Sequence, residues 1–104
     1  EDGGAVLELG ELTIDMSKRL VTRGGTPVKL SRKEYDLLKI LASHPDKVIT
    51  HQQLLKEVWG PAYTEETQYL RVYIGQLRQK LERDPANPAH LITEPGVGYR
   101  LRVG

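Results

Sequence analysis

The sequence contains no cysteine and no phenylalanine, and tryptophan and methionine occur only once each. Without cysteine, a disulfide framework and a thiolate metal site are both excluded. The three histidines lie far apart, at positions 44, 51 and 90, and share no metal-ligand spacing with one another or with an acidic pair. We therefore expect no bound metal. The core of this 104-residue chain must be built mainly from aliphatic side chains.

Long apolar runs are also missing. None approaches the roughly 20 residues that a membrane-spanning helix needs, and no signal-peptide pattern opens the chain. The expectation is a cytoplasmic protein with no membrane partner. No Ser/His/Asp set or phosphate-binding glycine loop is recognisable, and the Gly-x-Gly at 96–98 precedes a predicted strand, so it fails as a dinucleotide motif. We predict that the chain is not an enzyme and needs no cofactor.

The net charge of +1 hides an uneven distribution of charge. Residues 1–16 carry five acids and no Lys or Arg, whereas residues 67–104 carry six bases and three acids. The C-terminal third is therefore the part of the chain that attracts a polyanion. A small basic excess is common on protein surfaces, so this observation alone is weak.

Turn residues divide the chain into segments whose periodicity predicts an α+β domain. Residues 1–4 are acidic and glycine-containing and are interpreted as a linker remnant, which leaves a domain over 5–104. Four strand-like runs follow, at 5–9, 12–16, 20–23 and 27–30. Gly24-Gly25 joins the last two as a hairpin turn. These runs predict a four-stranded antiparallel sheet.

Three helices are predicted next. Ser31 with Glu34, and Thr50 with Gln53, have the spacing of a capping box, and Thr64 is expected to cap a third helix with acids in its first turn. The third helix is predicted from about 65 to 83, with an apolar stripe formed by Leu70, Ile74, Leu77 and Leu81. Strands at 90–94 and 99–103, joined by the turn 95–98, complete the chain as a hairpin.

The face of the third helix opposite the stripe is polar and basic, and we place Glu82 on it as well. Arginine can bond two acceptors on guanine or a phosphate, and glutamine can do the same for adenine. Gly75 lies mid-helix, where glycine costs about 1 kcal/mol relative to alanine. Close approach of a nucleic-acid backbone or of another helix would explain it. The simpler alternative is a solvated helix face. The residues that offer base-reading groups are Gln68, Arg71, Arg78 and Gln79.

The final hairpin and the loop before the third helix offer further contacts. Gly98 is expected to leave a backbone amide open to phosphate, with Thr93 and Arg100 beside it. The alternative is an edge hairpin whose arginines prevent aggregation. The loop from Trp59 to Tyr63 either presents a surface to a protein partner or packs Trp59 on the core.

Three separated segments, 48–60 (VITHQQLLKEVWG), 69–82 (YLRVYIGQLRQKLE) and 92–101 (ITEPGVGYRL), resemble the effector domain of OmpR/PhoB-type response regulators. The resemblance implies a winged helix-turn-helix: a four-stranded sheet, three helices and a hairpin wing. It implies that the third helix enters the major groove of double-stranded promoter DNA. The implied recognition-helix residues are Thr67, Gln68, Arg71, Val72, Tyr73, Gln76, Arg78 and Gln79, and the implied backbone and wing residues are Trp59, Thr93, Gly98 and Arg100.

The resemblance also implies protein partners. The loop that would meet RNA polymerase is Gly60, Pro61, Ala62, Tyr63 and Thr64. Family members carry a receiver domain, absent here, through which a sensor kinase acts. The isolated domain is then expected to be monomeric and the phosphorylated full protein dimeric. Some members have an arginine that enters the minor groove where Pro95 stands, so we expect this wing to bind phosphate rather than read bases.

Other functions compete with duplex binding. A winged-helix protein-interaction module would use the loop after Trp59 and the helix face without any DNA. RNA binding is disfavoured because exposed aromatics are not clustered on one predicted sheet. A hydrolase is the least favoured alternative.

Overall fold

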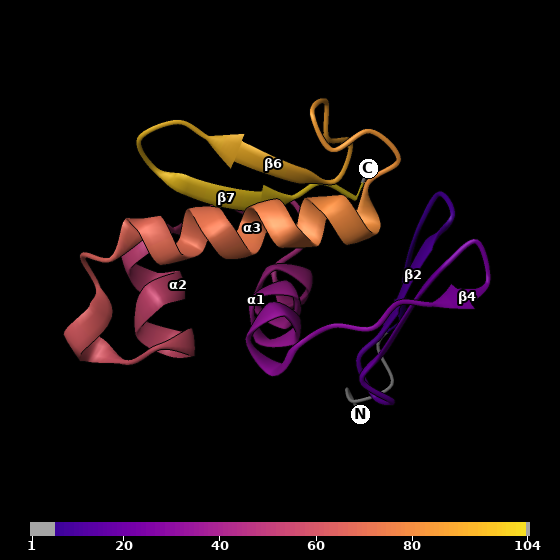
Figure 1. Ribbon diagram of the computed structural model, residues 1–104, viewed down its shortest axis with the longest axis horizontal. Helices are drawn as coiled ribbons and strands as arrows, with labels where there is room; N and C mark the ends of the chain where they lie inside the picture. The colour runs from indigo at the N-terminus through magenta and orange to yellow at the C-terminus, as the bar shows by residue number, and fades with distance from the viewer. Residues whose placement is uncertain (1–5, 104) are drawn as a thin grey trace.

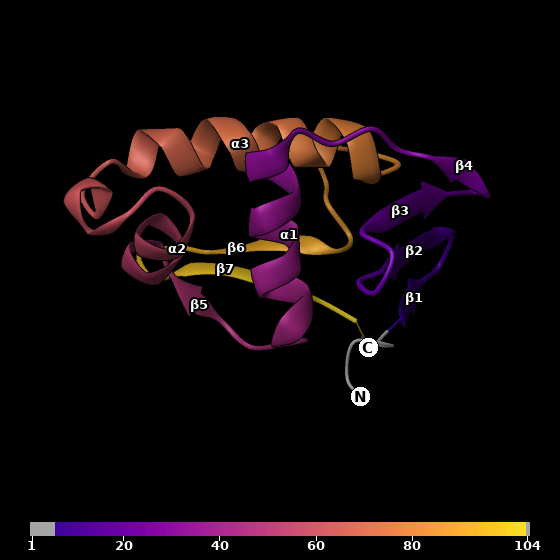
Figure 2. The ribbon, with the colours of Figure 1, turned by 90° about the horizontal axis from the view of Figure 1, so that it is seen from below.

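Two antiparallel sheets flank three α-helices in the computed structural model, which describes residues 6–103 (Figure 1). The predicted linker remnant 1–4 and the predicted domain ends 5 and 104 lie outside the described residues. The predicted order of a four-stranded sheet, three helices and a final hairpin is confirmed. The long third helix lies along one side of the molecule, against both the hairpin and the other helices, and the first sheet lies near its C-terminal end (Figures 1 and 2).

The first sheet is a meander of β1 (Val6–Leu9), β2 (Leu12–Asp15), β3 (Leu20–Arg23) and β4 (Thr26–Pro27), in that order. The alternation predicted for β2 is confirmed, since Leu12 and Ile14 are buried and Thr13 and Asp15 are not. Gly24 and Gly25 both have positive φ, as a tight hairpin turn between twisted strands requires. β4 is shorter than predicted because residues 28–30 leave the sheet to reach the first helix.

The first two helices begin at the predicted caps. In α1 (Arg32–Ser43) the Ser31 hydroxyl accepts the Glu34 amide and the Glu34 carboxylate accepts the Ser31 amide, so the capping box is confirmed. In α2 (His51–Val58) the Thr50 hydroxyl accepts the Gln53 amide at 3.1 Å. The Gln53 side chain instead donates to Glu57 at 3.1 Å, one turn further along. The second predicted box is therefore only half formed.

The start of α3 (Thr67–Leu81) was predicted wrongly. A short 3₁₀ helix, η2 (Pro61–Tyr63), precedes it, and Thr64 ends η2 instead of capping α3. The Glu66 amide donates back to Tyr63 O at 3.0 Å, which keeps 65 and 66 in the turn and outside α3. Glu66 is the N-cap residue, and no side chain caps the helix. α3 ends at Leu81, two residues earlier than predicted, because Glu82 is extended.

The apolar stripe of α3 is confirmed and holds the helix to the centre of the domain. Leu70, Ile74, Leu77 and Leu81 are each at most 2% exposed. They belong to one core cluster that also includes residues of α1, α2, the first sheet and the hairpin. Such burial is the main source of stability for a helix in a protein.

The hairpin gains a third strand that the sequence did not predict. β6 (Leu91–Glu94) pairs with β7 (Gly98–Leu101), and β5 (Ile49–Thr50) pairs with the other edge of β7. A Cβ added at Gly98 would lie 1.9 Å from Ile49 O. Gly98 is thus a buried strand residue, and its missing side chain allows β5 to approach. The expectation that it presents an open amide from the turn is wrong.

Candidate nucleic-acid interface

One long face of α3 is not covered by any other described element, as Figure 2 shows along one side of the molecule. Its polar side chains project away from the buried stripe. The exposed members of the predicted recognition set are Thr67, Gln68, Arg71, Val72, Gln76 and Gln79. Val72 is 48% exposed, which is high for an apolar residue on an ordered helix. These six predicted residues therefore form one accessible surface, called here the α3 face.

Arg71 is the free cation of the α3 face. Within residues 6–103 its side chain takes part in no hydrogen bond or ion pair, so its whole guanidinium fork is available. Gly75 follows one turn later, and a Cβ there would meet nothing within 4 Å. No contact inside the described chain explains this glycine. Of the two predicted explanations, packing against another helix of this domain is excluded.

Arg78 occupies a different environment from that predicted. Its Nε and Nη2 both donate to Leu91 O, at 3.1 and 2.8 Å, and Nη2 also donates to Thr93 Oγ1 at 2.7 Å. Arg78 is half-buried and turned toward β6. Sequence periodicity places it beside the other polar residues of α3 but cannot reveal which neighbouring strand it meets.

Glu82 was expected on the exposed side of the helix and is instead 2% exposed. Its carboxylate accepts three backbone amides, from Ala89 and His90 at 2.9 Å each and from Leu91 at 2.7 Å. These bonds fix the loop between α3 and β6. The sequence offered one signal that we missed: the two prolines at 85 and 88 force a loop that returns to the helix end, where unpaired amides need an acceptor.

The wing is β6, β7 and their turn. The Val97 amide donates to Glu94 O at 3.0 Å, with Pro95 second and Gly96 third in the turn at φ 75°, the conformation of a type II turn. Arg100 is not a free cation, because its Nε lies 3.0 Å from Glu94 Oε2 across the hairpin. Thr93 is exposed but already accepts from Arg78.

Four aromatic rings gather where α2, η2 and α3 meet. Trp59 is half-buried against Tyr73 and Tyr69, with ring centroids 5.2 and 5.9 Å apart, and Tyr63 lies 6.1 Å from Tyr69. Lys33 lies over the Trp59 ring at 5.6 Å. Trp59 thus packs partly on the core, which is one of the two alternatives given above for the loop from Trp59 to Tyr63. Pro61, Ala62 and Tyr63 are exposed, and Gly60 and Thr64 are half-buried.

A groove of about 470 Å³ separates the wing turn from the starts of α2 and α3. It was missed by the sequence analysis, because its walls come from three distant segments. Since α2 begins here, the positive end of its dipole favours an anion at that wall of the groove, whereas the Glu65 carboxylate adds negative charge at another. Its lining consists of Thr50, His51, Gln52, Thr64, Glu65, Thr67, Gly96 and Val97.

One ion pair joins the C-terminal end of α3 to α1. Lys80 Nζ lies 2.7 Å from Glu34 Oε1 and donates to Lys29 O at 3.0 Å. Burial alone would raise the pKa of Glu34, but the hydrogen bonds from Lys80 and the Ser31 amide outweigh it, so the pKa is lowered from its ordinary value. Glu34 is therefore a charged, structural carboxylate.

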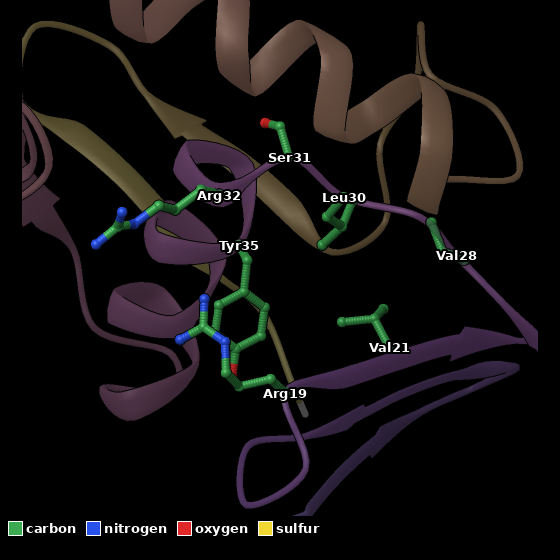
Figure 3. Close-up of a pocket in the computed structure, with 7 residues that line it drawn as sticks. All are labelled: Arg19, Val21, Val28, Leu30, Ser31, Arg32 and Tyr35. Carbon is green, nitrogen blue, oxygen red and sulfur yellow. The ribbon is translucent and has the colours of Figure 1, made fainter.

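A separate cavity of about 120 Å³ lies between the first sheet and α1, away from the α3 face (Figure 3). The Arg19 guanidinium covers the ring of Tyr35 at 4.2 Å. Burial raises the pKa of the Tyr35 hydroxyl, which has no hydrogen-bond partner among residues 6–103. Besides apolar side chains, the cavity is lined by Ser31, Tyr35 and two arginines, and no carboxylate or histidine is among its lining residues.

The sheet, the helices, the wing and the exposed α3 face together define a winged helix-turn-helix of the kind found in DNA-binding transcriptional regulators. Residues 25–101 match the family described as "Transcriptional regulatory protein, C terminal", and the chain belongs to this family, as an OmpR/PhoB-type effector domain. This fold and family are those of DNA-binding transcriptional regulators.

Among its relatives are the KdpE regulators. The chain is 50% identical to the transcriptional regulatory protein KdpE of Mycobacterium tuberculosis (strain H37Rv) over 98 residues, which cover 94% of this chain and 43% of that protein. It is 47% identical to the KDP operon transcriptional regulatory protein KdpE of Escherichia coli (strain K12), covering 94% and 44%. The chain therefore spans less than half the length of these relatives.

A solved structure gives a close match in fold. The Klebsiella pneumoniae RstA DNA-binding domain, in complex with the RstA box, superposes with a TM-score of 0.83 at 32% identity, over 95% of this chain and 98% of that one.

In the described part of the chain, no helix combines the length and apolar character needed to cross a membrane.

Proposed function

We propose that this chain binds double-stranded promoter DNA in a sequence-specific manner, as the output domain of a two-component response regulator. The observation that carries the proposal is the α3 face, on which Arg71 lies among exposed polar side chains and has no hydrogen-bond or ion-pair partner in the described part of the chain. A free guanidinium on an uncovered helix suits bidentate contact with guanine in the major groove. Gln68 and Gln79 offer the corresponding contacts to adenine.

Phosphate contacts are proposed on two sides of α3. On the side of the wing, one DNA strand lies over the groove, where the start of α2 favours negative charge. Arg100 is paired through Nε with the Glu94 carboxylate, whose negative charge offsets part of its attraction for phosphate, so it supplies a weaker contact than a free arginine. Trp59 and Tyr73 lie at the other side, where their polar edges approach the second strand.

The family and the KdpE relatives support wider proposals. We propose control of a potassium-transport operon; the E. coli relative is named as a transcriptional regulator of the KDP operon. The domain is 5–104, after a linker remnant at 1–4, and a receiver domain phosphorylated by a sensor kinase precedes it in the whole protein. The isolated domain is monomeric and the phosphorylated protein dimeric. The exposed residues of η2 contact RNA polymerase, and the protein works in the cytoplasm.

A gel-shift series on promoter duplexes at two salt concentrations tests the proposal. Arg71→Ala should cost about 1–3 kcal/mol on the preferred duplex and less on others, because a base contact is lost. Lys39→Ala removes an equal charge from the exposed side of α1 and serves as the matched control, with little expected effect. Binding that does not depend on salt, or no binding to any duplex, would contradict the proposal.

The exposed aromatics favour a second candidate function, a protein-interaction module without DNA binding. Tyr63 and Tyr69 are 41% and 40% exposed, and aromatic residues are enriched at protein interfaces. This alternative predicts that Tyr63→Ala abolishes binding to polymerase while Arg71→Ala changes nothing. The duplex-binding proposal predicts that Arg71→Ala weakens DNA binding and that Tyr63→Ala leaves it unchanged.

A further inference from the structure

Arg78 in the last turn of α3 and Glu82, the residue that follows this helix, hold the same residue of the wing. The Leu91 carbonyl accepts from Arg78 Nε and Nη2 at 3.1 and 2.8 Å, and the Leu91 amide donates to Glu82 Oε2 at 2.7 Å. β6 pairs with β7 on one edge only, so Leu91 lies on the strand edge that faces α3. We call Arg78, Glu82 and Leu91 the wing clamp.

In the wing clamp, side chains form the hydrogen bonds to the edge of β6 that a neighbouring strand would otherwise form. An unpaired edge leaves backbone groups that must find partners when they are buried. Here the partners are a guanidinium and a carboxyl group, and hydrogen bonds to such groups are the stronger kind. Arg78 extends the contact to Thr93 Oγ1 at 2.7 Å, so the clamp reaches the middle of β6.

The donors of Arg78 are largely used by these contacts. Arginine has five N–H donors, and a bidentate base contact needs both nitrogens of one edge of the guanidinium. The guanidinium can offer two such edges, Nε with Nη2 and Nη1 with Nη2, and Nη2 belongs to both. Its two hydrogens are already donated to Leu91 O and Thr93 Oγ1. Arg78 cannot contact guanine in the bidentate manner without releasing the wing. Arg71 has no such restriction.

We infer that Arg78 is a positioning residue, which fixes the wing relative to α3 so that both contact one duplex in a set register. This inference rests on the proposed function for its consequence in DNA binding, whereas the clamp itself belongs to the free protein. Arg78 therefore contributes to affinity for every sequence, and Arg71 contributes to the choice among sequences. The positioning role of Arg78 revises the sequence-based prediction that both Arg71 and Arg78 read bases.

Two measurements on the 104-residue chain test the inference. The first is amide hydrogen exchange of the free protein. Arg78→Gln should raise exchange in β6 and β7 about tenfold, since it removes bonds from a charged donor, while the amides of α1 keep their protection. Arg78→Lys, which keeps one charged donor, and Thr93→Val, which removes one acceptor, should give smaller increases. Arg71→Ala is the matched control on the same helix and should leave wing exchange unchanged.

The second measurement is affinity for the preferred duplex and for a panel with single base-pair changes. Arg78→Gln should weaken binding to all of them by a similar factor, about tenfold, and preserve their order. Loss of preference at one base pair, or unchanged wing exchange in both the Gln and Lys variants, would overturn the inference. If the unaltered chain binds no duplex, the proposed function fails, and the exchange results alone decide whether Arg78 positions the wing.

Discussion

Replacing Gly75 with alanine should raise stability and lower DNA affinity at the same time. The residue lies inside α3, its φ is not positive, and a Cβ there would meet nothing within 4 Å. The backbone conformation and the space both accept alanine. Glycine in a helix interior costs about 1 kcal/mol relative to alanine. Gly75→Ala should therefore add about 1 kcal/mol to the free energy of unfolding, equivalent to about 4–8 °C in Tm for a domain of this size.

The loss of affinity follows from where Gly75 lies. It is one turn from Arg71 and one turn from Gln79, on the side of α3 that we place in the major groove. If the duplex approaches closely there, an added methyl group must push it away. Overpacking an interface typically costs 1–3 kcal/mol, so we expect affinity to fall by about tenfold or more.

Thermal unfolding and gel shifts on the same preparation would measure both effects. Gly75→Ser is a useful second variant, because serine is a poorer helix former than alanine and slightly larger. It should gain less stability and lose at least as much affinity. Higher stability with unchanged affinity would refute close approach of the duplex at this position. Lower stability would refute the reasoning from open space around Gly75.

Two further predictions concern the free protein. Gly98→Ala should lower the free energy of unfolding by about 3 kcal/mol or more in urea titrations, since its Cβ would lie 1.9 Å from Ile49 O and β5 would have to move; a mild effect would contradict this. The pKa of Glu34 is lowered on folding. Its ion pair with Lys80 should therefore stabilise the protein fully at pH values above the ordinary pKa of 4.5, and this stabilisation should be lost as the pH falls through the lowered pKa. Lys80→Met should flatten this acid-side slope in unfolding curves, and an unchanged slope would contradict the assignment.

Local patterns in the sequence predicted the elements whose causes are local. The stripe of α3 follows a 3.6-residue period, and the capping box at Ser31 depends on residues three apart. The Gly24-Gly25 turn is equally local. All three are present in the structure as predicted.

Features that depend on distant contacts were missed or misread. β5 has two residues and exists because β7 passes beside it, which no periodicity records. Thr64 had the chemistry of a cap, but the turn after η2 placed Glu66 at that position instead. Glu82 looked like a surface residue on a helical wheel and became buried once the loop after α3 folded back on it.

The sequence predicted which residues belong to the candidate site better than it predicted what each residue does there. Six of the eight residues predicted for the recognition helix are exposed, whereas Tyr73 and Arg78 are half-buried. Arg78 and Arg71 have the same chemistry and lie seven residues apart on one helix, so sequence alone could not separate them. The structure separates them, because Arg78 donates to Leu91 and Thr93 of β6, whereas the Arg71 side chain has no hydrogen-bond or ion-pair partner among residues 6–103.

The most direct test of sequence-specific duplex binding is selection of bound duplexes from a random pool by the unaltered chain and by Arg71→Ala. We predict one enriched motif for the unaltered chain. For the variant, preference should disappear at one base pair or two adjacent ones and persist elsewhere. A pool that stays unenriched, or a motif that the variant recovers unchanged, would contradict the reading of bases by the α3 face.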